Sequence, residues 1–253
     1  TRMNLQTVME SRLAMAEDLP DPGEAWARYP ATVLRRVARN FPDARTGADL
    51  AFVSDLPLAS GMSSSSAFMV AVFLAVAGIN RLRQTAAYRR EIHSAEELAG
   101  YLATVENGQS FGSLTGDSGV GTFGGSEDHT AMLCGRAGEL SQYSFCPVRH
   151  ERQLPFPRRH VFIVGVSGVV AEKTGAAKAA YNRASLAVRA ILEAWRTTSG
   201  TADASLAAAV DRGSAGALRE SLARATVGGF SVASLRDRLD QFIEESVTII
   251  PAA

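Results

Sequence analysis

The sequence predicts an α+β protein with two domains. Segments in which apolar residues recur at helical spacing alternate with shorter segments that show the alternation or the apolar run of β-strands. A proline-containing segment, Arg149–Arg159, separates an N-terminal part from a C-terminal part that opens with an apolar run. We therefore expect a first domain over residues 1–155 and a second domain over residues 156–253.

The composition argues against several classes of partner. The chain has 253 residues, with 26 Lys and Arg against 26 Asp and Glu, so its formal net charge is zero. This balance disfavours bulk electrostatic binding of nucleic acid or of an anionic membrane. Cys134 and Cys146 lack metal-ligand spacing, and we expect both to be free thiols. No signal peptide or convincing membrane span is visible, which predicts a cytoplasmic protein of undetermined oligomeric state.

The N-terminal part predicts a helix, a strand and a second helix in that order. Apolar residues in Ala31–Phe41 recur at helical spacing, which is typical of an amphipathic helix. Ala48–Asp55 is short, partly alternating and bounded by turn-forming residues, so we expect a strand. Phe68–Ala77 is apolar nearly all round, which predicts a buried helix.

The loop Pro57–Ala67, rich in small residues, joins that strand to that helix. Unpaired backbone N–H groups and the positive end of the helix dipole favour an anion at such a place. Gly61 permits a close approach of the ligand, and Ser63–Ser66 offer hydroxyls to a phosphate or to Mg²⁺. A nucleotide phosphate is the expected ligand, although a serine-rich cap on a core helix explains the same pattern. The loop is not a Walker A sequence, because no Lys follows the glycine.

A helix, a glycine-rich segment and an acidic cluster follow. Ser94–Glu97 is a capping-box pattern and begins a helix that ends near Gly108. Residues 108–125 are rich in Gly, Ser and Thr, which is typical of a surface loop or linker and also of a functional loop. Ser126–Leu133 begins with acidic residues and continues as an apolar run, either helical or extended.

The rest of the chain predicts two strands and several helices. Glu139–Phe145 alternates like a strand, and His160–Val166 is an apolar run typical of a buried strand. Helices are expected over residues 171–195, over residues 205–225 as one helix or a pair, and over residues 234–243.

The serine loop resembles the phosphate loop of the GHMP kinases, whose pattern is Pro-x-x-x-Gly-Leu-x-Ser-Ser-Ala. Its run of serines is most similar to the galactokinase branch of that family. The chain departs from the pattern with Met62 for Leu, Ser66 for Ala and Met69 for an acidic residue. Ala59 and Ser60 occupy positions that are usually small.

The resemblance implies the two-domain GHMP kinase fold. In that fold a ribosomal-protein-S5-like N-terminal domain precedes a ferredoxin-like C-terminal domain. The similarity extends over roughly residues 24–245, and the order of its motifs is more specific than any one of them. The family's N-terminal Gly-Arg-x-Asn-Leu-x-Gly-Glu-His-x-Asp segment and its C-terminal glycine-rich loop have no counterpart, so we expect the chain to lack parts of both ends of the fold.

The resemblance also implies roles for the residues that match family motifs. Glu106 matches the acid of an Ala-Glu helix end, and Gly125–His129 matches Gly-x-x-Asp-Gln. By that match Asp128 is the catalytic carboxylate and contacts the substrate with Gly125, while Glu106 and Ser65 hold Mg²⁺. His129 stands where most relatives have Gln, and we expect it to support the site without touching the substrate. The residues expected to bind the ATP phosphates are Ser60, Gly61, Met62, Ser63, Ser64, Ser65 and Ser66.

Some of these assignments have an alternative in the residues alone. Tyr181 lies in a segment that resembles the galactokinase helix ending in Tyr-Asn-x-Arg, which implies a substrate contact. A half-buried helix tyrosine explains that position equally well. Glu106, Glu127 and Asp128 are likewise typical of solvated charges or helix caps when the family is left aside.

The expected function is phosphorylation of a sugar hydroxyl by ATP with Mg²⁺, in the manner of galactokinase. A small-molecule sugar is the expected partner, with no nucleic acid and no membrane. The sequence does not name the acceptor. A GHMP kinase for another small alcohol and a sugar or nucleotide sensor without turnover stay open as alternatives.

Overall fold

The structure, a computed structural model, describes residues 11–56, 61–145, 148–165, 167, 175–224 and 228–250. The chain divides into two compact units, residues 1–171 (unit 1) and residues 172–253 (unit 2). This division lies beyond the expected boundary at residues 155 and 156. The functional identity of the two expected domains stays a prediction.

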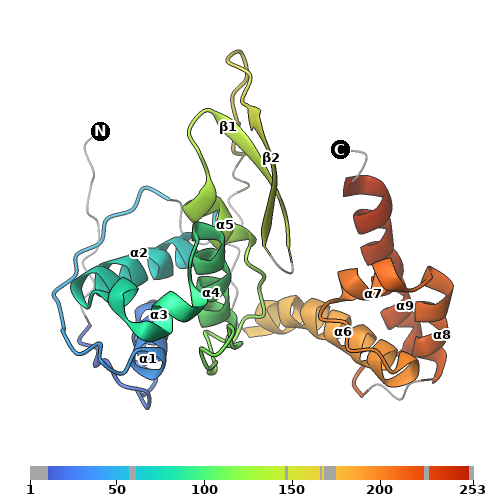
Figure 1. The fold of residues 1–253 in the computed structure, drawn as a ribbon, viewed down its shortest axis with the longest axis horizontal. Helices are drawn as coiled ribbons and strands as arrows, with labels where there is room; N and C mark the ends of the chain where they lie inside the picture. The colour runs from blue at the N-terminus through green and yellow to red at the C-terminus, as the bar shows by residue number, and fades with distance from the viewer. Residues whose placement is uncertain are drawn as a thin grey trace. The chain divides into compact units, whose positions relative to one another are not determined.

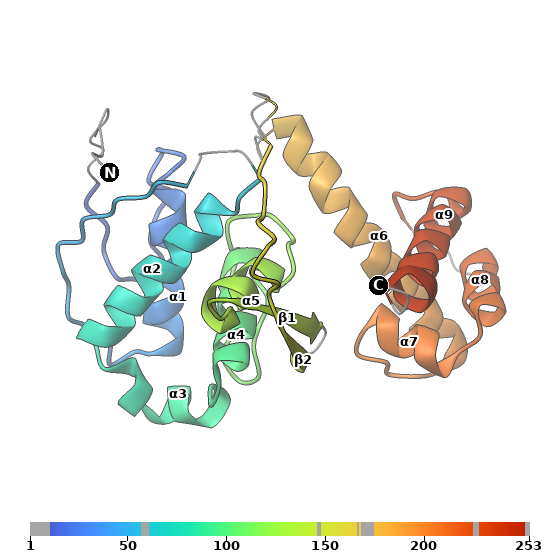
Figure 2. The same ribbon diagram turned by 90° about the horizontal axis from the view of Figure 1, so that it is seen from above.

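Unit 1 is built on a group of packed helices, shown in Figure 1 and from above in Figure 2. Its core includes aromatic and aliphatic side chains that are at most 1% exposed, among them Phe41, Phe73, Tyr101 and Leu102. The elements are α1 (Arg28–Asn40), α2 (Ser64–Ile79), the 3₁₀ turn η1 (Leu82–Gln84), α3 (Ala86–Glu91), α4 (Ala95–Asn107) and α5 (Glu127–Cys134). The helices expected on either side of the serine loop are therefore confirmed, and the open choice at residues 126–133 is a helix.

Local chemistry explains where these helices begin and end. The Ser94 hydroxyl accepts a hydrogen bond from the Glu97 backbone N–H at 3.1 Å, as the capping-box pattern predicts. Gly108 ends α4 in the left-handed conformation, with φ of 85°. Helix α2 buries most of its apolar residues but leaves Leu74 and Ile79 each 40% exposed, so it is less enclosed than its composition predicts.

A β-hairpin follows the helices of unit 1. Strand β1 (Glu139–Ser144) pairs antiparallel with β2 (Arg149–Pro155), with an irregularity in register between Gln142 and Tyr143. Strand β1 was expected. Strand β2 occupies Arg149–Pro155, the first part of the segment that we expected to form the domain boundary, and its backbone pairs with β1. The boundary itself stays a prediction.

Two other expected strands are wrong. Ala48–Asp55 is exposed and pairs with no described strand, and His160–Val164 is likewise unpaired. In the second segment, Val161, Phe162 and Ile163 are 78%, 76% and 89% exposed. A strand needs a neighbouring backbone to satisfy its N–H and C=O groups, and the described part of the chain provides none for either segment. Val166 lies outside the described residues.

The secondary structure of the described part of unit 2 is helical, with short loops between the helices. Its elements are α6 (Gly175–Ser199), α7 (Leu206–Arg212), α8 (Ala215–Arg224), α9 (Val232–Ile243) and the π-helical turn η2 (Glu244–Ile249) (Figure 1). Ile191, Leu218, Leu222, Leu235 and Leu239 form its core and are at most 1% exposed. The expected helices, with the pair over residues 205–225, are confirmed. The ferredoxin-like domain is not, because such a fold requires a sheet that these residues do not form.

Candidate active site

The N-terminus of α2 carries the serine loop. Gly61 and the helix N-cap Ser63 both have left-handed backbones, with φ of 77° and 53°. The Ser63 side chain does not cap the helix, and Ser64, Ser65 and Ser66 lie within its first turn. The first-turn backbone N–H groups therefore lack the side-chain cap that the alternative interpretation of the loop requires. Ser60 lies outside the described residues, and Met62 is 39% exposed.

Three segments that are far apart in the sequence meet at a buried cluster formed by Ser66, Glu106 and His129. The Ser66 hydroxyl donates a hydrogen bond of 2.8 Å to Glu106 Oε2. His129 Nε2 lies 3.3 Å from the same carboxylate oxygen. Ser66, Glu106 and His129 are 1%, 9% and 1% exposed. The first turn of α2, the last turn of α4 and the first turn of α5 thus come together at one carboxylate.

The order of groups in the cluster excludes one kind of chemistry. In a hydrolase triad the imidazole lies between the nucleophilic hydroxyl and the carboxylate, so that it can take the proton of the hydroxyl. Here the carboxylate of Glu106 lies between Ser66 and His129. Ser66 donates to a carboxylate and has no neighbouring base in the position that nucleophilic catalysis needs.

Asp128 and Glu127 lie beside this cluster in the sequence of α5 but differ in setting. Asp128 is half-buried and Glu127 is exposed. Neither carboxylate has a hydrogen bond or an ion pair with the part of the chain that the structure describes. Both lie in the first turn of α5, where the helix dipole favours a negative charge. Asp128 is therefore the more enclosed of the two and directly precedes the buried His129.

The glycine-rich segment is fixed against α1 along much of its length, by contacts that motif analysis missed. The fully buried guanidinium of Arg36 donates to the backbone oxygens of Thr104 at 2.8 Å and of Thr115 at 3.0 Å, and also to that of Gln109. Arg35 forms an ion pair of 2.9 Å with the buried carboxylate of Asp117. The interpretation as a free surface loop is therefore wrong for this part of the segment.

The glycines of this segment permit close backbone contacts. A Cβ atom on Gly108 would lie 2.6 Å from the backbone oxygen of Asp117, and a Cβ on Gly119 would clash with the backbone oxygen of Glu106. The Val120 N–H donates to that same Glu106 oxygen at 2.9 Å. The segment therefore returns to the end of α4 before it reaches α5. Gly125 is different, because a Cβ there would meet nothing within 4 Å.

Comparison with known proteins identifies the domain that contains the loop and Glu106. Residues 28–125 match the family described as "GHMP kinases N terminal domain". This part of the chain is a GHMP kinase N-terminal domain. The match covers α1 to α4 and the glycine-rich segment, and it ends directly before α5, which carries Asp128 and His129.

Galactokinases are among the relatives of this GHMP domain. The chain is 43% identical over 54 residues to the galactokinase of Actinobacillus succinogenes, which is 21% of this chain and 14% of that protein. It is 38% identical over 55 residues to the galactokinase of Haemophilus influenzae, or 22% of this chain and 14% of that protein. The aligned part of the chain thus spans only about a seventh of the length of these relatives. No solved structure matches the chain.

Sequence reasoning about the GHMP domain found most, but not all, of the clustered residues. It assigned Ser65 and Glu106 as ligands of Mg²⁺ and all the serines to the ATP phosphates, but it did not foresee the hydrogen bond from Ser66 to Glu106. Ser65 is half-buried and has no hydrogen bond with a described residue. The helical period explains the choice, because the first turn of α2 directs Ser66 towards α4. His129 was expected to support the site, and its place beside Glu106 fits that role.

Residues outside the GHMP domain give less information about the site. Tyr181 lies on α6 in unit 2 and is 40% exposed. Cys134 is a free, buried thiol whose pKa is raised by burial, and Cys146 lies outside the described residues.

Among the described residues, no group of three or more His, Cys, Asp or Glu side chains could hold a metal ion. None of the described helices has the length and hydrophobicity that a membrane crossing requires.

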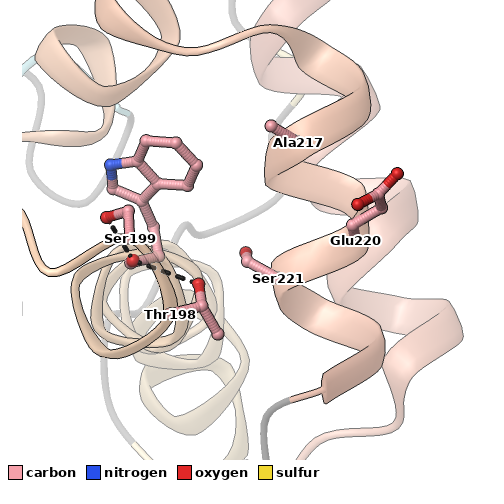
Figure 3. Close-up of a pocket in the computed structure, with 6 residues that line it drawn as sticks. Thr198, Ser199, Ala217, Glu220 and Ser221 are labelled. Atoms are coloured by element: carbon pink, nitrogen blue, oxygen red, sulfur yellow. Dashed lines mark hydrogen bonds between the residues drawn. The ribbon is translucent and has the colours of Figure 1, made fainter.

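A shallow pocket lies in unit 2, away from any motif. Figure 3 shows its two walls, with Thr198 and Ser199 on α6 facing Ala217, Glu220 and Ser221 on α8. Its volume is about 250 Å³. Within the drawn set, hydrogen bonds join Thr198 and Ser199 to the backbone of their own helix, as is common for hydroxyl side chains in helices. None of the predicted site residues lines this pocket.

Proposed function

We propose that the protein is an ATP-dependent kinase that transfers the γ-phosphoryl group to a hydroxyl of a sugar, in the manner of galactokinase. The observation that supports this most is the meeting of the serine loop, Glu106 and the Asp128 segment at one buried cluster. Phosphoryl transfer needs cradled phosphates, a cation and a group that orients the acceptor. These three segments supply candidates for each part, and the GHMP domain match adds weight.

The N-terminus of α2 is the proposed site for the phosphates of ATP. Its first-turn N–H groups and its helix dipole favour an anion, and the serine hydroxyls add further donors. Gly61 contributes a backbone in which a Cβ would meet no neighbour within 4 Å, so the loop has room for a ligand there. In the proposal, Ser60 and Gly61–Ser66 together surround the phosphates.

Glu106 and Ser65 are the proposed ligands of Mg²⁺. Carboxylate and hydroxyl oxygens are ligands that suit Mg²⁺, which also takes phosphate oxygens and water. The Glu106 side chain is 11% exposed, which leaves its carboxylate within reach of the solvent side of the cluster. Bound Mg²⁺ would neutralise charge on the phosphates.

Asp128 is proposed to orient the acceptor hydroxyl and to take its proton. Its carboxylate is half-buried and has no competing partner among the described residues, so it is available to an acceptor. Gly125 and Tyr181 are proposed as substrate contacts. The sugar is the proposed partner and the cytoplasm the proposed location, both by analogy with the galactokinases that the chain resembles.

The test is an ADP-release assay on the full-length protein against a panel of sugars and small alcohols. Asp128→Asn should lower kcat by about 10²–10⁴-fold, with ATP binding nearly intact, because a positioned base contributes on that scale. Glu127→Gln is the matched control and should change kcat little. Release with a non-sugar alcohol alone would point to a different GHMP kinase. Binding of ATP and sugar without turnover would favour a sensor, and full activity of Asp128→Asn would remove Asp128 from the mechanism.

A further inference from the structure

His129 is buried without a hydrogen-bond partner. It is 1% exposed, and neither of its ring nitrogens has a partner with hydrogen-bond geometry. A buried polar group without a partner is destabilising, because it has given up its hydrogen bonds to water. His129 Nε2 lies 3.3 Å from Glu106 Oε2, within ion-pair distance, but that oxygen already accepts the Ser66 hydroxyl. The ring nitrogens of His129 therefore need a partner other than the described side chains.

The separation between the two atoms suits a shared metal ion. Ligand atoms about 2.1 Å from one metal, at angles between octahedral and tetrahedral, lie about 3.0–3.4 Å from each other. The 3.3 Å between His129 Nε2 and Glu106 Oε2 lies in this range, and it lacks the geometry of a direct hydrogen bond. The pair can therefore present a nitrogen and an oxygen to the same cation.

The backbone around the cluster presents helix ends of both signs. Glu106 lies in the last turn of α4, so the negative end of that helix faces the cluster. The N-termini of α2 and α5 bring their positive ends to the same place, which would favour phosphate as a further ligand. One acid, one imidazole and the phosphates of a nucleotide would then share the ion.

We infer that Glu106, proposed above as a ligand of Mg²⁺, forms with His129 a mixed carboxylate–imidazole site for a divalent cation, and that the imidazole makes this site take Mn²⁺ in preference to Mg²⁺. Imidazole suits transition-metal cations, whereas Mg²⁺ prefers oxygen alone. The inference rests on the proposed function only for the phosphates that would complete the coordination.

The first experiment measures Mn²⁺ binding to the full-length protein without nucleotide, by the loss of the free Mn²⁺ signal in electron paramagnetic resonance. His129→Gln should weaken Mn²⁺ binding by at least about tenfold, since even supporting partners of metal ligands contribute about 10–100-fold. Mg²⁺ should compete poorly with Mn²⁺ in the parent protein and better in the variant. His93→Gln is the matched control, because His93 forms an exposed pair with Glu97 at 3.0 Å.

A second experiment needs no variant and so does not depend on folding of a mutant. Substoichiometric Mn²⁺ should broaden the imidazole resonances of His129 in NMR spectra and leave those of His93 unchanged. Equal broadening of both histidines, or unchanged Mn²⁺ affinity in His129→Gln, would overturn the inference. If Mn²⁺ binding depends on His129 but the protein releases no ADP, the metal site stands and the kinase proposal fails. If the protein releases ADP but Mn²⁺ does not broaden the resonances of His129, the kinase proposal stands and the metal site fails.

Discussion

Two segments of the chain differ from what their composition predicts, and they differ in opposite directions. They are the glycine-rich segment, residues 108–125, and the apolar segment, residues 161–164. The first is polar and small, yet Arg35 and Arg36 of α1 fix it, Arg35 through Asp117 and Arg36 through backbone oxygens of the segment. The second is strongly apolar, yet Ile163 is 89% exposed. The difference lies in partners. Backbone oxygens in the first segment find a buried guanidinium, whereas the second segment has no paired strand in the described part of the chain.

The largest effect should come from the group that anchors the glycine-rich segment. Arg36→Met removes a buried charge that binds backbone oxygens of the segment at Gln109 and Thr115 and leaves those oxygens unsatisfied. We expect the free energy of unfolding to fall by about 3–5 kcal/mol, measured by chemical denaturation. Arg45→Met is the control, because Arg45 is exposed and should change stability little. Equal stability of the two variants would show that the segment is not anchored as described.

A smaller loss should follow from the close backbone contact of the same segment. Gly119 has φ of 57°, and a Cβ there would clash with the backbone oxygen of Glu106. Gly119→Ala should lower the free energy of unfolding by about 1–3 kcal/mol. Gly47→Ala is the matched control, since a Cβ on Gly47 would meet nothing within 4 Å. If Gly119→Ala left the free energy of unfolding unchanged, the segment would be able to move away from α4 without loss of stability.

Acid should weaken one further anchor of the segment. A hydrogen bond from Ser113, and then one from Arg90, lowers the pKa of Glu91 below its ordinary value of 4.5. A lowered carboxyl pKa stabilises the fold above the unfolded value and loses that contribution as pH falls through the folded value. Unfolding free energies between pH 7 and pH 3 should therefore fall more in the parent protein than in Glu91→Gln. Glu127→Gln, an exposed control, should follow the parent.

The apolar segment should show the smallest effect. Ile163→Glu replaces a side chain that is 89% exposed, so the free energy of unfolding should change by no more than about 0.5 kcal/mol. The same substitution at Ile191, which is fully buried in unit 2, serves as the destabilising control. A large loss at Ile163 would indicate that this segment is buried as the strand that its composition predicts.

Helices were predictable because their signals are local. The cap at Ser94, the glycine at Gly108 and the apolar spacing of α1 act within a few residues, and the structure agrees with each. Strands at residues 48–55 and 160–166 were not predictable in the same way. An apolar or alternating run predicts which side chains are buried. The pairing of a strand, however, depends on a second segment that the run does not specify.

The candidate site was predictable where a motif supplies it and less so where packing does. The serine loop, Glu106 and the Asp128 segment came from motif order, and the structure brings Ser66, Glu106 and His129 together. The choice of Ser66 over Ser65 depends on the rotation of α2 against α4, which the spacing of serines does not reveal. The role of Arg36 was invisible because its partners are backbone oxygens, which carry no residue identity.

Because the glycine-rich segment returns to the end of α4, the number of residues between Glu106 and α5 overstates how far the chain travels between them. Asp117 N–H donates to the Gly108 oxygen at 3.0 Å, and Val120 N–H donates to the Glu106 oxygen at 2.9 Å. The residues between these contacts form a closed loop, in which Gly112 and Ser113 are exposed. The number of residues between Glu106 and α5 therefore does not measure the path between them, because the chain closes back on Glu106 at Val120 before it continues towards α5.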